Sequence, residues 1–476
     1  MKIRVRIAPS PTGSPHIGTI WQALINYSYA KRYKGDFIVR IEDTDRKRFI
    51  EGAEKELFSA LKWFSLEPLE SPIYGGSFGP YRQSERLKIY QKQVLKLIDK
   101  DKAYYCFCSP ERLEQARQVQ VKKGLSVMYD KKCREIKSGE AIKRVEAGEK
   151  AVIRLKVPLN EKIIVKDLLR GEIEFNSQVL DDQVLVKSDG FPTYHLAVVV
   201  DDHLMEISHV VRGEEWLSSA PKHVLLYQYF GWLEPVWVHT PIIRNPDKSK
   251  LSKRHGHASV SWYKNNGYLS QAILNFLSLL GWSHPKEKTV FSLTEFTKYF
   301  DLRDLSPVGP VVDLKKLDYL NGVYIRNTKD EELLELIKPF LKIKIEDSQL
   351  LKIIPLIKER INKLTEVEGL IDFFVNDFKL SPEDLLVKSG TKELVKKQLE
   401  EVIKILKDVK WDLEEITRVI QDIVLKNDYH KGQFFMMLRL SLTGKKISPP
   451  LLESIDILGR EKTLKRLQNS LSLIEN

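Results

Sequence analysis

The first forty residues switch from the period of a strand to that of a helix and back. Apolar and charged residues alternate over 3–7, as in a half-buried strand. Apolar positions then recur about every 3.6 residues over 17–29 and predict a helix, and the run 37–41 predicts a second strand. This order favours a βαβ unit, so we predict a parallel sheet that binds its ligands beyond the carboxyl ends of the strands.

The pattern becomes mixed after about residue 85. Strands are predicted at 151–157 and 163–165, and the apolar runs 191–200 and 208–212 predict buried strands. From about residue 260 the pattern is mostly helical, and from 326 Leu and Ile recur with Lys and Glu at helical spacing. We therefore predict a Rossmann-like α/β domain that is split by an α+β insertion and followed by an all-α region.

These changes of pattern set the domain boundaries that we expect. The two halves of the α/β domain fall at 1–82 and 191–254, around the insertion at 83–190. A connecting domain follows at 255–325, and a helical region at 326–476 has a further break near 376.

Composition and charge narrow the class of protein. With 42% hydrophobic and 30% charged residues, the 476-residue chain is typical of globular proteins and unlike disordered ones. The formal net charge is +12, and it is concentrated in residues 1–325, which hold 50 basic and 39 acidic side chains against 27 and 26 in the remainder. A polyanionic partner such as nucleic acid should therefore meet a folded N-terminal surface instead of a basic tail.

Neither a membrane segment nor a secretory signal is visible in the sequence. No apolar run approaches the ~18 residues that span a bilayer, and the first residues alternate where a signal peptide would be continuously apolar. The three cysteines are few and odd in number, which fits a reducing compartment. We expect a cytoplasmic protein without a membrane partner.

Two segments carry candidate chemistry for a phosphate ligand. A proline-rich loop at 9–15 precedes His16 and Gly18 at the start of the predicted helix, where free N–H groups attract anions. Residues 245–256 hold four Lys or Arg side chains among small polar ones, as expected of a loop that neutralises a polyphosphate. A helix cap and a solvated run of charge are the plain alternatives. No P-loop and no G-x-G-x-x-G motif is present.

Together, the two segments resemble the two signature motifs of class I aminoacyl-tRNA synthetases. His-Ile-Gly-Thr stands at 16–19 and Lys-Leu-Ser-Lys-Arg at 250–254. From residue 3 to the C-terminus the chain resembles the glutamyl-tRNA synthetase family, in the order and spacing of the segments at 6–13, 40–45, 79–86, 193–197 and 212–216.

The resemblance implies a two-step ligation of L-glutamate to tRNA(Glu), with ATP and Mg²⁺ as co-substrate and the protein acting as a monomer. It assigns the catalytic roles to His16, Lys250 and Lys253. The residues implied in ATP binding are Thr12, His16, Gly18, Lys250, Ser252 and Lys253. Fixed cations suit this chemistry, because negative charge builds up on the phosphate oxygens in the transition state.

Selection of glutamate needs cations for its side chain and an anion for its amino group. The glutamate-binding residues that the resemblance implies are Arg6, Ala8, Ser10, Glu42, Tyr194 and Arg212. Arg6 and Arg212 would hold the side-chain carboxylate, and Glu42 the ammonium. Many relatives carry Asn where this chain has Val198, so one polar contact to the amino acid is missing or is made by water.

The cysteines form a close pair, Cys106 and Cys108, and a distant single residue, Cys133. Such a pair can chelate one ion, and thiolates suit zinc. By resemblance a structural zinc site lies in the insertion, with either Tyr129 or Glu135 as the fourth ligand. The alternative is three free thiols.

The resemblance also divides the contacts with tRNA among the domains. It implies that the insertion binds the acceptor end, that the connecting domain contacts the stem and that the helical region binds the anticodon. The implied tRNA-binding residues of that region are Arg360, Arg439 and Thr443. For each of them alone, a solvated helix flank is an equally good interpretation.

Other functions remain open at this stage. The main alternatives are a non-discriminating enzyme that also charges tRNA(Gln), or a glutamine-specific one, and a non-catalytic tRNA-binding relative. A truncated paralogue that modifies a tRNA base and a small-molecule adenylyltransferase both lack the long helical C-terminal region that this chain has.

Overall fold

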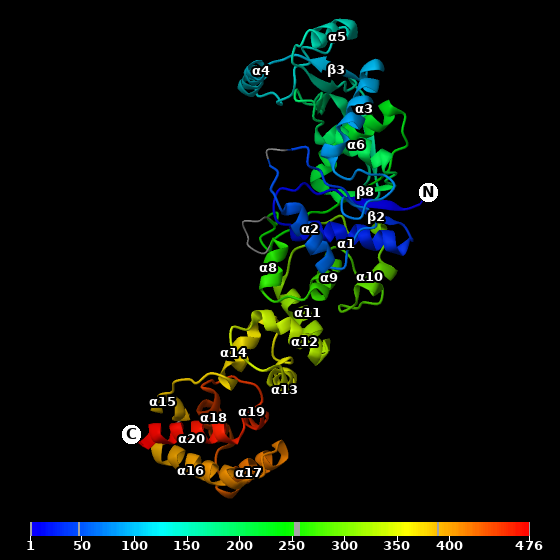
Figure 1. Ribbon diagram of the computed structural model, residues 1–476. Coiled ribbons are helices and arrows are strands. Elements are labelled where there is room, and N and C mark those ends of the chain that lie inside the picture. The colour runs from blue at the N-terminus through cyan, green and yellow to red at the C-terminus, as the bar shows by residue number, and fades with distance from the viewer. Residues whose placement is uncertain (1, 46–47, 252–257, 388–389, 476) are drawn as a thin grey trace. The chain divides into compact units, whose positions relative to one another are not determined.

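The computed structural model describes residues 2–45, 48–251, 258–387 and 390–475 (Figure 1). The chain forms two compact units. The first consists of Met1–Tyr263 and Ile273–Asp313, and the second of Lys264–Ala272 and Leu314–Asn476.

The first unit opens with the strand, helix and strand that the sequence predicts. These are β1 (Arg4–Ile7), α1 (Ile17–Arg32) and β2 (Asp36–Val39), and the two strands pair in parallel. All four residues of each strand are buried, including Arg4 and Arg6. The alternation of charge in this segment therefore reflects buried ion pairs and not an exposed sheet face.

A second sheet lies beside β1. Its strands are β8 (His209–Gly213), β9 (Val236–Thr240), β5 (Lys162–Asp167) and β6 (Gly171–Asn176), in the order β6-β5-β9-β8. Strand β9 is parallel to both neighbours, and β5 and β6 form an antiparallel hairpin. The segment 83–190 thus contributes two strands to the sheet that carries β8 and β9.

The prediction of a strand at 191–200 is wrong. This segment forms α6 (Tyr194–Leu204), and each residue from Leu196 to Val200 is at most 1% exposed. A helix that is buried on all sides loses its polar face, so its apolar run has the same appearance as that of a buried strand. The strands predicted at 151–157, 163–165 and 208–212 are confirmed as β4 (Val152–Leu155), β5 and β8.

The remaining elements of the first unit surround these sheets. An antiparallel sheet is formed by β3 (Ala103–Cys106), β4 and β7 (Val184–Val186). The helices are α2 (Ala53–Trp63), α3 (Leu87–Asp99), α4 (Pro110–Lys122), α5 (Ser138–Glu146), α7 (Ala220–Phe230), α8 (Val260–Asn265), α9 (Ser270–Ser278) and α10 (Leu293–Tyr299), of which α8 and α9 cross the boundaries of the unit.

The second unit confirms the helical region predicted from residue 326 onward. Its helices pack around a continuous core of Leu, Ile, Val and Phe side chains, as expected from their helical spacing. They are α11 (Leu314–Asn327), α12 (Asp330–Ile337), α13 (Asp347–Ile357), α14 (Val367–Ile371), α15 (Pro382–Leu385), α16 (Lys392–Asp408), α17 (Leu413–Lys426), α18 (Lys431–Thr443), α19 (Leu451–Leu458) and α20 (Arg460–Glu475).

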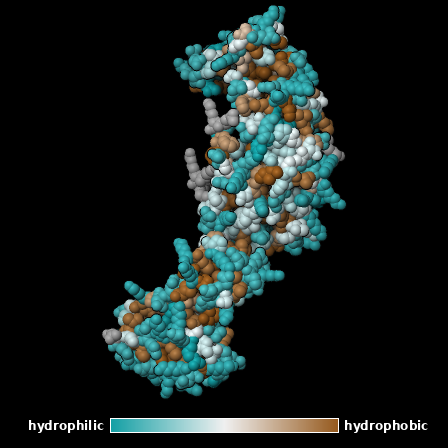
Figure 2. All heavy atoms as spheres, in the orientation of Figure 1, coloured by the Kyte–Doolittle hydropathy of each residue, from teal (hydrophilic) through white to brown (hydrophobic). Residues whose placement is uncertain are grey.

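The surface carries no continuous apolar belt on the face that Figure 2 shows, where hydrophilic residues lie between smaller apolar groups. Among the described residues, no helix has both the length and the apolar character that crossing a bilayer requires.

Candidate active site

A cavity of about 1360 Å³ opens at the carboxyl ends of β1 and β8. It is larger than the ~300–1,000 Å³ of an ordinary ligand site, so it has room for more than one substrate. The predicted site residues that line it are Arg6, Ala8, Ser10, His16, Gly18, Glu42, Tyr194, Arg212 and Lys250. Thr12 lines a smaller adjoining recess with Ser10 and His16, and Ser252 and Lys253 lie outside the described residues.

His16 is the N-cap of α1, which is the plain interpretation of this residue. Its Nδ1 accepts a hydrogen bond from the backbone N–H of Gly18 at 3.0 Å. The proton of the neutral ring is therefore on Nε2, which makes that nitrogen a donor. A Cβ at position 18 would lie 3.1 Å from the same Nδ1, which explains the glycine.

The chain just after the second signature segment, at Ala258 and Ser259, lies close to the start of α1. The N–H of Ile17 donates to the carbonyl of Ala258 at 2.8 Å, and His16 forms a bridge with Ser259. Lys250 lines the cavity with a side chain that is 62% exposed, and its Nζ is 3.9 Å from Oε1 of Glu215. Its ammonium is thus largely solvated and can reach an anion in the cavity.

Glu42 supplies a buried carboxylate in the cavity wall. It is 8% exposed, and its Oε1 accepts a hydrogen bond from Nη2 of Arg40 at 3.2 Å. Desolvation raises the pKa of Glu42 to about 7, although the charges of Arg40 and Arg6 favour the ionised form. A cationic group that bound beside Glu42 would further stabilise the carboxylate.

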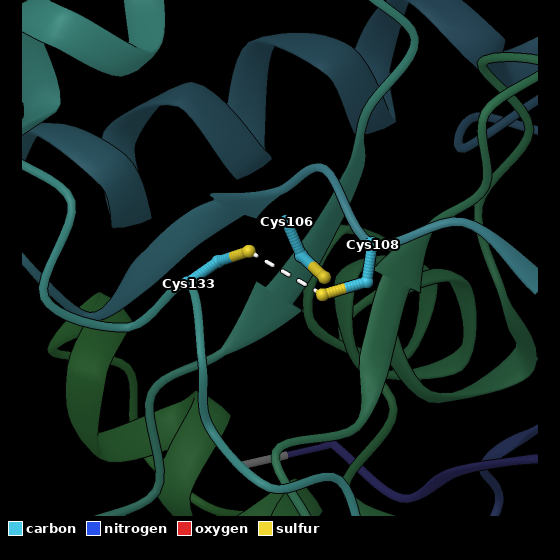
Figure 3. A group of neighbouring side chains, drawn as sticks. All are labelled: Cys106, Cys108 and Cys133. Carbon is cyan, nitrogen blue, oxygen red and sulfur yellow. Dashed lines mark hydrogen bonds between the residues drawn. The ribbon is translucent and has the colours of Figure 1, made fainter. Parts of the chain in front are cut away.

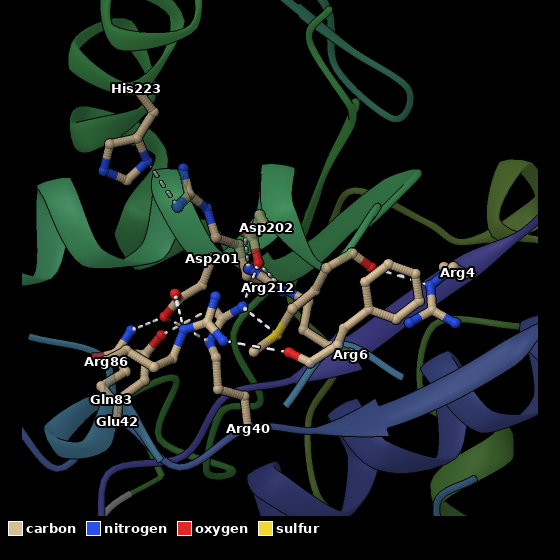
Figure 4. Close-up of polar contacts among 12 residues, drawn as sticks. Arg4, Arg6, Arg40, Glu42, Gln83, Arg86, Asp201, Asp202, Arg212 and His223 are labelled. Carbon is tan, nitrogen blue, oxygen red and sulfur yellow. Dashed lines mark hydrogen bonds and ion pairs between the residues drawn. The ribbon is translucent and has the colours of Figure 1, made fainter. Parts of the chain in front are cut away.

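Arg6 reaches the cavity wall with its charge already paired. Its Nε and Nη2 each donate to the carboxylate of Asp202 at 3.0 Å, and Nη1 donates to the carbonyl of Val211 at 3.3 Å. Asp202 also accepts from Nη1 of Arg40 at 2.7 Å. Figure 4 shows these groups in one cluster of buried arginines and carboxylates.

Arg212 is held differently, because its partners are uncharged. Its Nη1 donates to Oη of Tyr194 at 3.1 Å and contacts Nδ1 of His223 at 3.0 Å, while its Nε donates to Nε2 of His239 at 3.0 Å. Its Nη2 is buried and has no hydrogen-bond partner among the residues that the structure describes. A buried guanidinium nitrogen without a partner is costly unless a ligand satisfies it.

Sequence reasoning missed the residues that hold these arginines in place. Asp202 pairs with Arg6, and the adjacent Asp201 accepts from Nε of Arg86 at 2.7 Å. His223 and His239 contact Arg212 and are fully buried. The two acidic residues directly after the apolar run were the available signal, since buried carboxylates need cationic partners.

Val198, which stands where many relatives carry Asn, packs in the core. It is 1% exposed and belongs to the apolar cluster behind α6. It is not among the described residues that line the cavity.

The three cysteines converge in the segment 83–190 (Figure 3). The Sγ atoms of Cys106, Cys108 and Cys133 all lie within 4.8 Å of one another. The hydroxyl of Tyr129 lies 3.3 Å from Sγ of Cys106 and 3.4 Å from Sγ of Cys108, whereas Glu135 is exposed and lies outside the group.

These donors fit a zinc ion. Three sulfur atoms and a phenol oxygen within one small cluster of buried side chains can supply four ligands. Burial raises the pKa of Cys108 to about 11, and the neighbouring sulfur atoms add to the shift. Three thiolates this close would repel one another, and a divalent cation is the group that would make their ionisation favourable.

Comparison with known proteins places this geometry in a family. Residues 2–319 match the model described as the catalytic domain of class I tRNA synthetases (E and Q). The chain belongs to this family. Residues 332–471 match an anticodon binding domain, which covers most of the second unit.

Relatives from several bacteria match the chain over nearly its whole length. A glutamate–tRNA ligase of Gloeobacter violaceus is 42% identical over 97% of this chain and 94% of that protein. One from Dehalococcoides mccartyi is 43% identical over 98% and 96%. Among solved structures, a glutamate tRNA ligase from Elizabethkingia meningosepticum in complex with its amino acid superposes with a TM-score of 0.93, at 35% identity and with 100% of both chains covered.

In this family's anticodon-binding part, the three predicted residues differ in exposure. Arg360 is exposed. Arg439 is half-buried, its Nη1 donates to the carbonyl of Pro449 at 3.0 Å, and burial together with the charge of Arg360 lowers its pKa. Thr443 is buried, and its hydroxyl donates to the carbonyl of Arg439 at 2.8 Å. The two arginines thus lie close enough for their charges to interact.

Proposed function

We propose that this chain is a glutamate–tRNA ligase that forms glutamyl-adenylate from L-glutamate and ATP and then transfers the glutamyl group to the 3′-terminal ribose hydroxyl of tRNA(Glu). The observation that carries the proposal is the unpartnered Nη2 of Arg212 in the cavity wall. The description of the family names E and Q, the one-letter codes of glutamate and glutamine. A buried cation that lacks an anion favours the acid, glutamate, over the amide, glutamine.

Six residues form the proposed pocket for glutamate. Arg212 binds the side-chain carboxylate through Nη2, and Tyr194 fixes the guanidinium through its hydroxyl. Glu42 takes the ammonium, which adds a second cation beside the desolvated carboxylate that Arg40 already contacts. Arg6 forms the wall between them, and its remaining N–H groups are available for a second contact to the carboxylate. The backbone of Ala8 and the hydroxyl of Ser10 complete the pocket.

His16 and Lys250, which also line the cavity, suit the activation step. The α-carboxylate of glutamate attacks the α-phosphate of ATP and displaces pyrophosphate. Mg²⁺, when bound with ATP, would neutralise part of the phosphate charge. His16 donates from Nε2 to a phosphate oxygen, and Lys250 neutralises the leaving group. The resemblance implies that Lys253 acts with His16 and Lys250, and that Thr12, Gly18 and Ser252 also bind ATP. No residue is needed as a covalent nucleophile.

The remaining parts of the chain are proposed to bind tRNA. We assign the acceptor end to the insertion at 83–190, the stem to 255–325 and the anticodon to 326–476, where Arg360 and Arg439 offer two cations to the RNA. Thr443 supports this surface from within through its bond to Arg439.

Zinc in the insertion is proposed to be structural. Cys106, Cys108 and Cys133 would hold it, and Tyr129 is the fourth ligand that proximity favours over Glu135. When bound, the metal would cross-link β3 to the loop that carries Cys133. The three cysteines form no disulfide, which supports our proposal of a cytoplasmic location. We further propose that the protein acts as a monomer.

The experiment that tests the function is ATP–pyrophosphate exchange with glutamate and with glutamine, each with and without total tRNA. Exchange with glutamate alone is the expected result. Exchange with glutamine would instead assign the chain to the amide substrate, and exchange with neither would favour a non-catalytic tRNA-binding protein. Charging of purified tRNA(Glu) and tRNA(Gln) then separates a discriminating enzyme from a non-discriminating one.

A further inference from the structure

Arg212 lies between two buried histidines that form a hydrogen-bonded chain. The chain runs from Asp167 through His239 and Arg212 to His223, and it ends at His195. Oδ2 of Asp167 is 2.7 Å from Nδ1 of His239, and Nε2 of His223 is 3.1 Å from Nδ1 of His195. Figure 4 shows His223 beside the guanidinium group. None of these histidines was singled out by the sequence analysis.

The donors and acceptors in this chain can be assigned without ambiguity. Arginine only donates, so Nε2 of His239 and Nδ1 of His223 must both accept from Arg212. Each ring then carries its proton on the other nitrogen. His239 donates from Nδ1 to Asp167, and His223 donates from Nε2 to His195. Both rings are therefore neutral, in agreement with burial, which lowers the pKa of each.

The consequence is that Arg212 keeps its whole charge. The neighbouring Arg6 and Arg40 both pair with Asp202, whereas no carboxylate forms an ion pair with Arg212 among the described residues. Asp167 is separated from the guanidinium by the ring of His239. The histidines accept hydrogen bonds from Nε and Nη1 of Arg212 and fix its orientation without neutralising it.

We propose that His223 and His239 are positioning residues that set the preference for acid over amide, because they hold Arg212 with neutral acceptors and leave its charge for the substrate. This inference rests on the proposed glutamate activation and extends it to residues that do not touch the substrate. A carboxylate at either position would hold the guanidinium equally well but would share its charge. The pocket would then lose its preference for a negatively charged side chain.

The test compares two substitutions that have the same shape and differ by one charge. In His223→Asn the amide oxygen replaces Nδ1 as a neutral acceptor, and in His223→Asp a carboxylate oxygen does so. We measure KM and kcat for glutamate in pyrophosphate exchange with tRNA present, and the inhibition constant of glutamine against glutamate. Wild-type exchange with glutamate is measured first, and its absence would refute the proposed function itself.

We expect the KM for glutamate to be at least tenfold higher in H223D than in H223N. Between the same two variants, kcat and the inhibition constant of glutamine should change less than threefold. If His223 had only a structural role, the KM for glutamate and the inhibition constant of glutamine would change by similar factors. Equal KM values for glutamate in the two variants, in an active wild-type background, would overturn the inference.

A second pair of variants makes the same comparison from the other side of Arg212, in case H223D does not fold. His239→Gln and His239→Glu place a neutral or a charged acceptor at the position of Nε2. Each is combined with Asp167→Asn, because the carboxylate of Asp167 would otherwise repel the new glutamate. The same tenfold difference in KM is expected, and its absence would count against the inference.

Discussion

The buried carboxylate of Glu42 makes the binding of glutamate depend on pH near neutrality. Desolvation raises its pKa to about 7, against the opposing charges of Arg40 and Arg6. Only the ionised form can pair with the substrate's ammonium. From pH 7 to pH 6, kcat/KM for glutamate should therefore fall about fivefold, and below pH 6 about tenfold per pH unit, as the ionised fraction falls.

The charged groups of the substrate and the three histidines around Arg212 do not titrate in this window. The substrate's carboxyl groups lose their protons near pH 4 and its ammonium keeps its charge up to about pH 8, going by ordinary values for such groups. Burial lowers the pKa of His195 to about 3, and the pKa values of His223 and His239 are also lowered, so these rings stay neutral. Glu42 is therefore the group to which we assign the fall.

The substitution that isolates Glu42 is Glu42→Gln, which keeps the shape and cannot ionise. Loss of a charged hydrogen bond of about 1.5–3 kcal/mol should reduce kcat/KM for glutamate about 10- to 100-fold at pH 8. Between pH 6 and 7 the variant should show no further fall. The assay is pyrophosphate exchange at saturating ATP and tRNA, with the pH profile for ATP as the control. If E42Q kept the wild-type slope, another group would be responsible and the assignment would fail.

The same shift predicts an effect on stability. Because the pKa of Glu42 is raised from 4.5 to about 7 in the folded protein, that state binds the proton more tightly than the unfolded chain does. The free energy of unfolding therefore falls as the pH rises between these two pKa values, and the loss reaches about 3 kcal/mol above pH 7. E42Q lacks this loss, so its thermal midpoint should fall less than that of the wild type between pH 5 and pH 8. Equal falls would contradict the shift.

Three further substitutions test separate parts of the site. Arg212→Gln should lower kcat/KM for glutamate roughly 10²- to 10⁴-fold, because the substrate's carboxylate loses its cation, at a cost of about 3–5 kcal/mol. A fall of less than tenfold would argue against the assignment. Cys108→Ala should reduce bound zinc from about one equivalent to below about 0.2, as measured by metal analysis of protein purified without chelator, whereas zinc absent from the wild type would end the zinc proposal. Lys253→Ala should abolish pyrophosphate exchange while tRNA binding, measured by filter retention, persists; unchanged exchange would refute its role.

Elements with a strong local pattern could be predicted from the sequence. The strand, helix and strand of residues 4–39 and the helices of the second unit follow from periodicity that burial on one face imposes. The segment 191–200 could not be assigned correctly, because α6 is buried on all sides and shows no period. The pairing of the strands could not be predicted either, because β5 and β9 are far apart in the sequence and are brought together only by the fold.

The residues of the site likewise fall into those that the sequence could identify and those that it could not. His16, Glu42, Arg212 and Lys250 could be named because they stand in recognisable segments, and all four line the cavity. Their supporting residues could not be named in the same way. A buried histidine such as His223 gives no signal in the sequence, because its role depends on a guanidinium eleven residues away that only the fold brings to its ring.

The pairing of β5 with β9 limits how far the insertion can be treated as a removable module. Strand β5 ends at Asp167, whose carboxylate accepts hydrogen bonds from both the backbone N–H and Nδ1 of His239. A deletion of 83–190 would therefore remove two strands, β5 and β6, from the sheet together with Asp167, which fixes the tautomer of His239. A shortened enzyme that retains its amino acid pocket must keep the hairpin of β5 and β6, and its cut should fall before residue 162.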